Sequence, residues 1–579
     1  MAPVSKLHGR AFYESLGSPK FVLAPMVDQS EFAWRLLTRS FLPDEKKTSV
    51  LAYSPMLHAR LFADSPKYRA SHFEPVKAPL AMAAPGDKAH AEATLKPEDF
   101  YLDGNPKMDR PLFVQFCAND PDALLEAAKV VAPYCDAVDL NLGCPQGIAK
   151  RGHYGAFLQE DWDLISKMIS KLHAELDIPV TAKMRVLDTK EKTLDYAKMI
   201  LAAGASIITV HGRQREQKGH NTGLADWTIL RYLREQLPQE TVIFANGNIL
   251  QHADIHQCLE ETKADGVMSA EGNLYDPSIF AEPPAVGNEG REYWRGKDGK
   301  GGYRADAVLR RYLDIIHRHV LGEEPPQRKP LFLASDPLEV AAQSTAEETS
   351  NKRAAEEEGQ PPTKKQKIEA AKELKKNGGK VERVVNANFV AMQAHCFHIL
   401  RPLVSKAHNV RDALARCKSG DIAAYENVLS LTEAAVRDGL LAYEADPAAF
   451  EDPAPGPATN GENEEAEKKA PTESSDEAVR RCRRPYWVCQ SYVRPLPKEA
   501  YLKGSMQLSK KELKKLAAED DKIKEKISKD NSLAIQSGVP PEGVIATADK
   551  QLEKNVQTAE PRADKQESIK VPENGMVCG

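Results

Sequence analysis

Short apolar runs alternate with helical segments between residues 21 and 269, and this rhythm constrains the fold more than any other feature. Segments with apolar residues at helical spacing lie at 31–41, 122–134, 162–176, 193–203, 227–236 and 251–261. The apolar runs lie at 21–24, 49–53, 112–116, 137–140, 180–184, 207–210, 242–245 and 266–269. Such runs are typical of parallel strands buried on both faces. Eight strand and helix units in about 250 residues predict an α/β fold, the TIM (β/α)8 barrel.

A doubly wound sheet would show a similar alternation of strands and helices. No Gly-x-Gly-x-x-Gly motif opens any of the units, which disfavours a dinucleotide-binding sheet. We therefore assign the barrel to residues 20–284, after an N-terminal extension at 1–19. Residues 77–108 interrupt the rhythm and are rich in Ala, Pro, Lys and Asp. They predict an insertion that is looped or partly disordered between the second and third strands.

The chain beyond residue 284 is expected to be helical and repeatedly interrupted. After a polar linker at 287–302, a helical pattern at 305–320 and another at 386–443 predict one all-helical domain, built from 303–335 and 384–445. Residues 336–383 between its halves are poor in aromatics and predict a disordered insertion. The remaining segments are an acidic linker at 446–479, an arginine- and aromatic-rich patch at 480–497, and a charged, mostly disordered tail at 498–579.

Charge and cysteine content limit the partners and the compartment. A net charge of −5 argues against a generally basic RNA binder, so any contact with phosphates must come from local patches. No apolar run approaches the roughly 20 residues that cross a bilayer, and nine scattered cysteines indicate free thiols in a reducing compartment. We expect a protein of the cytoplasm, the nucleus or both. Basic clusters at 352–353 and 364–367 resemble a two-part nuclear import signal, or form a merely solvated charge run.

The fourth predicted strand leads into the loop with the most reactive chemistry. Its sequence, AVDLNLGCPQGIAKRGHYGAFL, spans residues 137–158. The Asn141 amide and the Cys144 thiol follow the carboxyl end of the strand, where ligands bind in barrels and in doubly wound sheets. Lys150 and Arg151 add cations suited to a phosphate-bearing partner, although many such loops are only solvated. A buried structural thiol is the alternative for Cys144.

This loop closely resembles the signature of the tRNA-dihydrouridine synthases, flavin enzymes that reduce uridine in tRNA. The strings FVLAPMVD, FVQFCANDP, TAKMRV, TVHGR, FANGNI and VMSAEGNLYDP occur in the family's order and are most similar to its eukaryotic branch, which acts on positions 16 and 17. The resemblance covers residues 20–284 well and the later helical part more loosely. It implies FMN as cofactor, NADPH or NADH as reductant and tRNA as substrate. We expect a monomer with no obligate protein partner and no membrane contact.

The resemblance also implies roles for residues at the predicted strand ends. Gln115 would contact the pyrimidine edge of FMN, and Lys183 would stabilise negative charge on the reduced ring. Backbone N–H groups of the last two loops would hold the phosphate. Many family members carry a basic residue where Glu271 stands, so its side chain is not expected to hold phosphate. The residues expected to bind FMN are Pro25, Met26, Gln115, Lys183, His211, Asn246, Gly247, Asn248, Ala270, Glu271 and Gly272.

Cys144 is the implied catalytic acid. A thiol with an ordinary pKa near 8.5 is mostly protonated at neutral pH, so it can deliver a proton to uracil C5 while the flavin gives hydride to C6. Asn141, Lys150 and Arg151 would contact the substrate. No metal is expected, because His395 with His398, and Cys482 with Cys489, offer too few ligands for zinc.

Two other functions stay open on the residues alone. One is a flavin reductase of free pyrimidines similar to the dihydroorotate dehydrogenases, and the other is a non-catalytic tRNA-binding protein. The helical domain and the patch at 480–497 disfavour the first, because an enzyme for small molecules has no evident use for them. Intact Cys144, Lys183, Gln115 and His211 disfavour the second.

Overall fold

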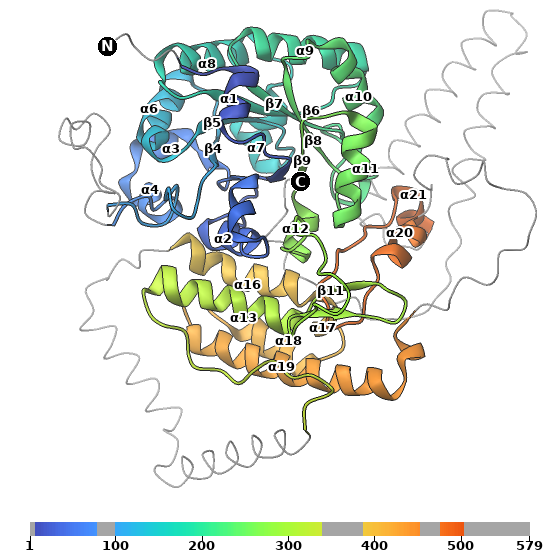
Figure 1. Ribbon diagram of the computed structural model, residues 1–579. Coiled ribbons are helices and arrows are strands. Elements are labelled where there is room, and N and C mark those ends of the chain that lie inside the picture. The colour runs from blue at the N-terminus through green and yellow to red at the C-terminus, as the bar shows by residue number, and fades with distance from the viewer. Residues whose placement is uncertain (1–5, 78–98, 338–385, 452–474, 503–579) are drawn as a thin grey trace, which may run out of the picture. The chain divides into compact units, whose positions relative to one another are not determined.

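The computed structural model describes residues 6–77, 99–337, 386–451 and 475–502 (Figure 1). Its internal contacts divide the chain into two units, residues 1–496 with 575–579, and residues 497–574. In the second unit the described part is helix α21 (Pro497–Leu502). All the elements below belong to the first unit. Among the described residues, no helix combines the length and the apolar character needed to cross a membrane.

Eight parallel strands of the described chain form a closed barrel, which confirms the predicted TIM-barrel fold. The barrel closes because β2 pairs with both β1 and β4. A two-residue strand, β3 (Leu57–His58), pairs beside the carboxyl end of β4. The barrel strands are β1 (Phe21–Leu23), β2 (Val50–Tyr53), β4 (Leu112–Cys117), β5 (Ala137–Leu142), β6 (Val180–Arg185), β7 (Ile207–His211), β8 (Val242–Asn246) and β9 (Gly266–Ser269).

Helices surround the barrel where the alternating pattern predicts them (Figure 1). Several begin at aspartate caps: the side chain of Asp120 accepts hydrogen bonds from two backbone N–H groups at the start of α6, and Asp161 caps α8. The helical elements of this part are α2 (Phe32–Arg39), η1 (Asp44–Ser49), α3 (Ala59–Asp64), α4 (Pro66–His72), α6 (Pro121–Val131), η3 (Ala132–Tyr134), α7 (Gly147–Gly152), η4 (Gly155–Leu158), α8 (Trp162–Glu175), α9 (Lys190–Ala202), η5 (Gly219–Asn221), α10 (Trp227–Gln236), α11 (His252–Thr262) and α12 (Glu271–Tyr275).

The N-terminal extension contains a helix, α1 (Gly9–Ser15), that the sequence pattern did not predict. Phe12 of this helix stacks on Phe113 at the start of β4, with ring centroids 5.8 Å apart. The Tyr13 hydroxyl donates a hydrogen bond of 2.9 Å to the Asp265 carbonyl, just before β9. Since both contacts lie at the amino ends of strands, α1 covers that end of the barrel and leaves the carboxyl end to the candidate site.

The described end of the predicted insertion at 77–108 is a loop that contacts the barrel. Its central part, 78–98, lies outside the described residues. Asp103 and Asp109 are buried and form ion pairs of 2.6 Å with Arg35 of α2, and Asp109 also pairs with Arg39 at 2.8 Å. Two cations and two carboxylates compensate one another here, as buried charges must. Residues 99–109 therefore fasten α2 to the barrel.

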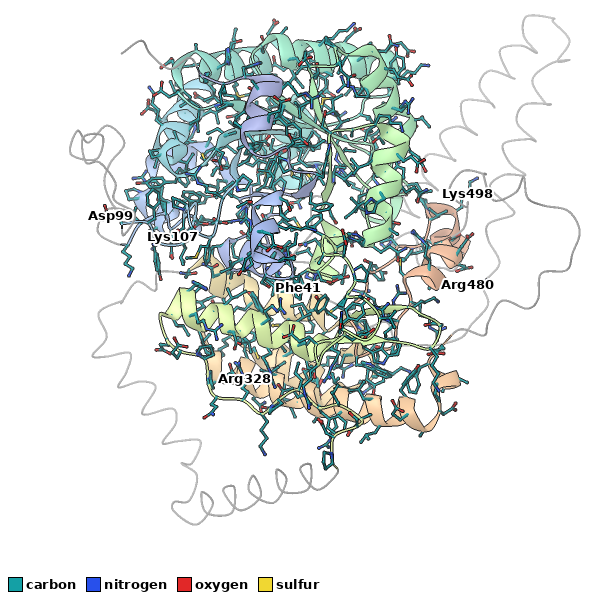
Figure 2. All side chains as sticks on the ribbon, in the orientation of Figure 1. Phe41, Asp99, Lys107, Arg328, Arg480 and Lys498 are labelled. Carbon is teal, nitrogen blue, oxygen red and sulfur yellow. The ribbon has the colours of Figure 1, made fainter. Side chains whose placement is uncertain are left out.

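The two predicted halves of the helical domain pack together. Helix α13 contacts α19, and both α13 and α16 contact α2 of the barrel (Figure 1). The indole of Trp34 in α2 stacks on the imidazole of His395, with ring centroids 3.9 Å apart. Phe41, labelled in Figure 2, lies just beyond α2. The Arg311 guanidinium lies 4.4 Å from its ring centre. The helical elements are α13 (Ala305–Ile315), η6 (Ile316–Leu321), α16 (Ala387–Ile399), α17 (Arg401–Val404), α18 (His408–Arg416), α19 (Ile422–Ala445) and η7 (Pro447–Ala449).

Three segments predicted as linkers or patches are ordered parts of this unit. The linker at 287–302 contains a hairpin of β10 (Tyr293–Arg295) and β11 (Gly301–Tyr303). Helix α20 (Ser475–Cys482) begins inside the predicted acidic linker. Trp487, from the patch at 480–497, is fully buried and contacts the rings of Trp294 and Phe450. The sequence pattern could not distinguish an exposed aromatic patch from a segment that completes the core.

Candidate active site

Polar side chains of three neighbouring strands meet in the barrel interior. Gln115 of β4, Asp139 of β5 and Thr181 of β6 are direct partners in strand register. The Gln115 amide nitrogen donates to Asp139 Oδ2 at 2.8 Å, and the Thr181 hydroxyl donates to Asp139 Oδ1 at 2.6 Å. Burial raises the pKa of Asp139 to about 6, against the lowering effect of these hydrogen bonds and of the Lys183 charge. The carboxylate is therefore mostly ionised at neutral pH.

Asn141 connects this cluster to the segment that carries Cys144. It lies within β5 rather than after the predicted strand, and its Nδ2 donates to Gln115 Oε1 at 2.7 Å. Its Oδ1 accepts hydrogen bonds from the backbone N–H of Gly143 at 3.1 Å and of Cys144 at 2.9 Å. The Asn141 side chain therefore positions the turn after β5.

Cys144 is fully buried at the carboxyl end of the barrel. It packs in a small apolar cluster with Cys117, Ala149 and Tyr154. Proton transfer to a large substrate therefore requires the thiol to become accessible from this packed position.

Lys150 and Arg151 lie on α7, a short helix, and not in the flexible loop that the glycines predicted. Both side chains are exposed. The His153 residue ends the helix with a left-handed backbone conformation, at φ 49°. The two cations thus stand on the surface of the same segment that buries Cys144, where a phosphate group can reach them.

Lys183 and His211 lie near the ends of β6 and β7. Lys183 is buried and pairs in register with Asn141 across β5 and β6. His211 Nε2 lies 3.1 Å from a guanidinium nitrogen of Arg213. Arginine can only donate, so His211 Nε2 accepts and the neutral ring carries its proton on Nδ1. Burial, with the charges of Arg185 and Arg213, lowers the pKa of His211 well below its ordinary value, so the ring is neutral.

The predicted phosphate loops follow β8 and β9. Gly247 has φ +115°, and a Cβ there would lie 2.5 Å from the Ala225 side chain, so only glycine fits. The half-buried Asn248 side chain is held in place by two hydrogen bonds: its Oδ1 accepts from Arg213 and from the Ala225 backbone N–H, both at 2.9 Å. Asn246 donates through Nδ2 to the Met268 carbonyl at 3.0 Å. Backbone N–H groups of this loop can donate to a ligand.

Ala270 is the N-cap of α12, and Glu271 and Gly272 are the first two residues of this helix. A Cβ at Gly272 would lie 2.2 Å from the Ile249 carbonyl oxygen, so the glycine permits close contact between the two loops. The Glu271 carboxylate forms an ion pair of 2.6 Å with Arg494. This pairing agrees with the expectation that Glu271 does not use its side chain to hold phosphate.

Pro25 and Met26 follow β1 and are both buried. The Met26 backbone N–H donates to the Ser30 hydroxyl at 3.0 Å. They lie at the same end of the barrel as the residues above, which is compatible with contact to a flat ring and equally with a packing role.

Cations and aromatic rings from distant segments gather beside α12. The Arg401 guanidinium lies 3.7 Å from the ring centre of Tyr492, and that ring lies 5.9 Å from the ring of Tyr275. Arg494 is nearby, 5.8 Å from the Tyr492 ring. The helical domain and the patch at 480–497 thus contribute side chains next to the carboxyl end of the barrel.

Some of the site residues that were missed had a signal in the sequence, and others had none. Asp139 is a charged residue in an apolar strand, two positions before Asn141, and strand alternation places the two side chains on one face. Arg213 follows His211 by two positions. Arg494 had no such signal, because its partner Glu271 is 223 positions away.

Two atoms at the strand ends are buried without a protein partner among the described residues: Nδ1 of His211 and Oδ1 of Asn246. Buried polar atoms normally have partners, so these two fit a polar ligand. No three His, Cys, Asp or Glu side chains of the described chain are grouped as a metal site. His395, weighed above as a zinc ligand, instead lies 3.0 Å from the Glu31 carboxylate.

Comparison with known proteins identifies relatives for the barrel. Residues 22–295 match the family model described as dihydrouridine synthase (Dus). The tRNA-dihydrouridine(16/17) synthase of Schizosaccharomyces pombe is 56% identical over 278 residues, which cover 48% of this chain and 61% of the relative. The Saccharomyces cerevisiae protein of the same name is 50% identical over 315 residues, 54% of this chain and 64% of the relative. The chain thus spans less than two thirds of either relative.

A human relative, named tRNA-dihydrouridine(20a/20b) synthase-like, is more distant but more fully covered. It is 32% identical over 263 residues, which make up 45% of this chain and 70% of the relative. Together with the family match, the ordered motifs and the barrel that carries them, this coverage shows that the chain belongs to the dihydrouridine synthase family.

Proposed function

We propose that this protein is a tRNA-dihydrouridine synthase that reduces uridine at position 16, position 17 or both, in the D-loop of tRNA. The observation that carries the proposal is the hydrogen-bonded chain from Asp139 through Gln115 and Asn141 to the backbone of Cys144. It holds the turn that carries the Cys144 thiol at the carboxyl end of a TIM barrel, where such enzymes place their chemistry. The names of the yeast relatives support the substrate and its positions.

FMN fits the residues at the strand ends. His211 Nδ1 can donate and Asn246 Oδ1 can accept, and neither atom has a partner among the described residues. Gln115 and Lys183 would hold the pyrimidine part of the ring, while the backbone at Gly247, with the Arg213 guanidinium, would hold the phosphate. Burial, with Arg185, lowers the pKa of Arg213 to about 10, and the group stays charged at neutral pH. FMN, when bound, supplies the hydride for uracil C6.

The protein supplies the proton. The Cys144 thiol would give its proton to uracil C5 as negative charge develops there, and the thiolate would recover a proton from solvent afterwards. Asn141 acts here by positioning Cys144, since its Oδ1 already accepts two backbone hydrogen bonds. The contact of Asn141 with the substrate stays a prediction. Lys183 would stabilise the negative charge left on the cofactor ring.

Local patches can hold the RNA despite the net charge of −5. Lys150 and Arg151 are exposed on α7, next to the buried thiol. The Arg401 and Tyr492 pair offers a guanidinium plane and a ring of the kind on which splayed bases stack. A uridine in a flexible single-stranded loop leaves its stack at little cost, which is what access to a barrel interior demands.

A single preparation tests the proposal. The purified protein should be yellow, release FMN on denaturation, and form dihydrouridine in an unmodified tRNA transcript when NADPH or NADH is added; the relatives' names include NAD(P). Mass spectrometry of nuclease fragments locates the modified position. Product in free uridine or another free pyrimidine, but not in tRNA, would establish the small-molecule reductase instead. A colourless protein that binds tRNA without product would establish a binding protein.

Location in the cell and oligomeric state belong to the same proposal. The basic clusters at 352–353 and 364–367 lie outside the described residues, and nuclear import through them stays a prediction. A reporter fusion with Lys364, Lys365 and Lys367 changed to Ala tests it, because an unchanged distribution would reduce the run to a solubilising one. The expected monomer is checked by light scattering of the purified protein.

A further inference from the structure

We propose that Asp139 is a positioning residue that fixes the orientation of the Gln115 and Asn141 amides, and through them the turn that carries Cys144. The inference rests on the proposed function. It adds a residue that does not touch the substrate but decides how two site residues present their donors and acceptors. The basis is the direction of every hydrogen bond in the chain between Asp139 and Cys144.

A side-chain amide can turn by 180° and exchange its donor and acceptor ends. An ionised carboxylate can only accept, so Gln115 must turn its Nε2 towards Asp139, at 2.8 Å. Its Oε1 then faces Asn141 and accepts from Nδ2 at 2.7 Å. Asn141 is left with Oδ1 towards the turn, where the backbone N–H groups of Gly143 and Cys144 can only donate. The Asp139 carboxylate at one end can only accept, and the backbone N–H groups at the other end can only donate. Together they allow one orientation of the two amides between them.

The setting of Asp139 makes this arrangement rigid. The carboxylate is fully buried, and its other oxygen accepts from the Thr181 hydroxyl at 2.6 Å. Two ionisable groups, Lys183 of β6 and Tyr53 of β2, also interact with it. An apolar residue here would leave the Gln115 Nε2 group buried without its acceptor and the amide held from the Asn141 side alone, which would loosen the hold on the turn that carries Cys144.

The orientation of Gln115 also matters for the cofactor. With one N–H given to Asp139 and one lone pair taken by Asn141, the amide is held at two points. Its second N–H has a fixed direction, which a freely turning amide would not have. Preorganised donors of this kind raise affinity because no orientation must be selected on binding.

The test compares Asp139→Leu with Asp139→Asn, whose amide oxygen can still accept from Gln115. Asp136→Leu is the matched control, because Asp136 immediately precedes the same strand and accepts from the Leu112 backbone N–H, at the opposite end of the barrel. One readout is the dissociation constant of FMN, measured by quenching of flavin fluorescence. The other is the alkylation rate of Cys144 by iodoacetamide, followed by peptide mass spectrometry, with buried Cys135 as internal reference.

We expect Asp139→Leu to weaken FMN binding about tenfold and to speed Cys144 alkylation about tenfold, the effect of one lost buried hydrogen bond. Cys135 should stay unreactive, and Asp139→Asn should lie closer to wild type. Asp136→Leu should lower the melting temperature and leave both readouts unchanged. If Asp139→Leu lowers only the melting temperature, as the control does, Asp139 is structural and the proposal is overturned.

Two further outcomes keep the test decisive. If Cys135 is also alkylated in Asp139→Leu, the barrel has unfolded and this variant cannot be used. The Asp139→Asn variant then decides the question. The proposal requires that Cys144 in Asp139→Asn is alkylated at least about threefold faster than Cys144 in wild type. Equal alkylation rates of Cys144 in Asp139→Asn and in wild type overturn the proposal. If wild-type protein binds no FMN, the proposed function fails, while the alkylation readout still tests the positioning role by itself.

Discussion

Glu74 gives the barrel a pH-dependent contact with the helical domain. Its carboxylate accepts hydrogen bonds from Asn386 Nδ2 at 2.9 and 3.0 Å, immediately before α16. Its backbone N–H donates to the Asp103 carboxylate at 2.6 Å. Burial, and then the charge of Asp103, raise the pKa of Glu74 from 4.5 to about 7, while the Asn386 bond opposes the rise.

The sign follows from proton binding. Between pH 4.5 and 7 the folded protein holds the Glu74 proton more tightly than the unfolded chain does, so stability falls as pH rises through this window. The shift corresponds to about 3 kcal/mol, at 1.36 kcal/mol for each pKa unit, and partial exposure of the side chain makes this an upper value. The loss of stability caused by the ionised Glu74 is complete above pH 7 and absent below pH 4.5.

Glu74→Gln removes the charge and keeps an oxygen that can accept from Asn386. Urea unfolding of both proteins should show equal stability near pH 4.5 and a more stable variant at pH 8, by up to about 3 kcal/mol. Other carboxylates, including Asp139, titrate in both proteins, so their contributions cancel when the unfolding free energies of the two proteins are subtracted. Glu45→Gln, on the exposed η1, should match wild type throughout. Parallel stability curves for wild type and Glu74→Gln would refute the reasoning.

Three further predictions concern the site and the core. Cys144→Ala should leave flavin reduction by NADPH near normal and slow reoxidation by tRNA about 10² to 10⁴-fold, since only the second step needs an acid; equal loss in stopped-flow measurements of both steps would make Cys144 structural. Gly247→Ala should weaken FMN binding at least about tenfold in fluorescence titration, because its Cβ would displace Ala225 and the loop; unchanged affinity would remove this loop from the cofactor site. Trp487→Ala should cost about 3 to 5 kcal/mol in urea unfolding, as for other buried aromatic residues; a loss under 1 kcal/mol would mean that residues 480–497 do not complete the core.

The alternation of apolar runs and helical segments was enough to predict the barrel. Strands buried on both faces must be continuously apolar, and this requirement is local, so it is visible at 137–140 or 242–245 without any tertiary information. Cys144 and Lys183 were found for the same reason, because each is a polar residue at or near a strand end. Motif order then pointed to the family, which the comparison with known proteins shows.

The sequence determined which residues stand at the carboxyl ends of the strands, since strand periodicity and breaking residues are properties of neighbouring positions. Only the tertiary structure decided how those residues bond. Gln115, Asn141 and Asp139 are close because strand register aligns β4 with β5, and Arg494 meets Glu271 only because the chain returns to the barrel after 223 positions. Trp487 was read as part of a patch because its burial depends on Trp294 and Phe450, which are also distant in sequence. Such contacts arise from packing between segments, and no local pattern encodes them.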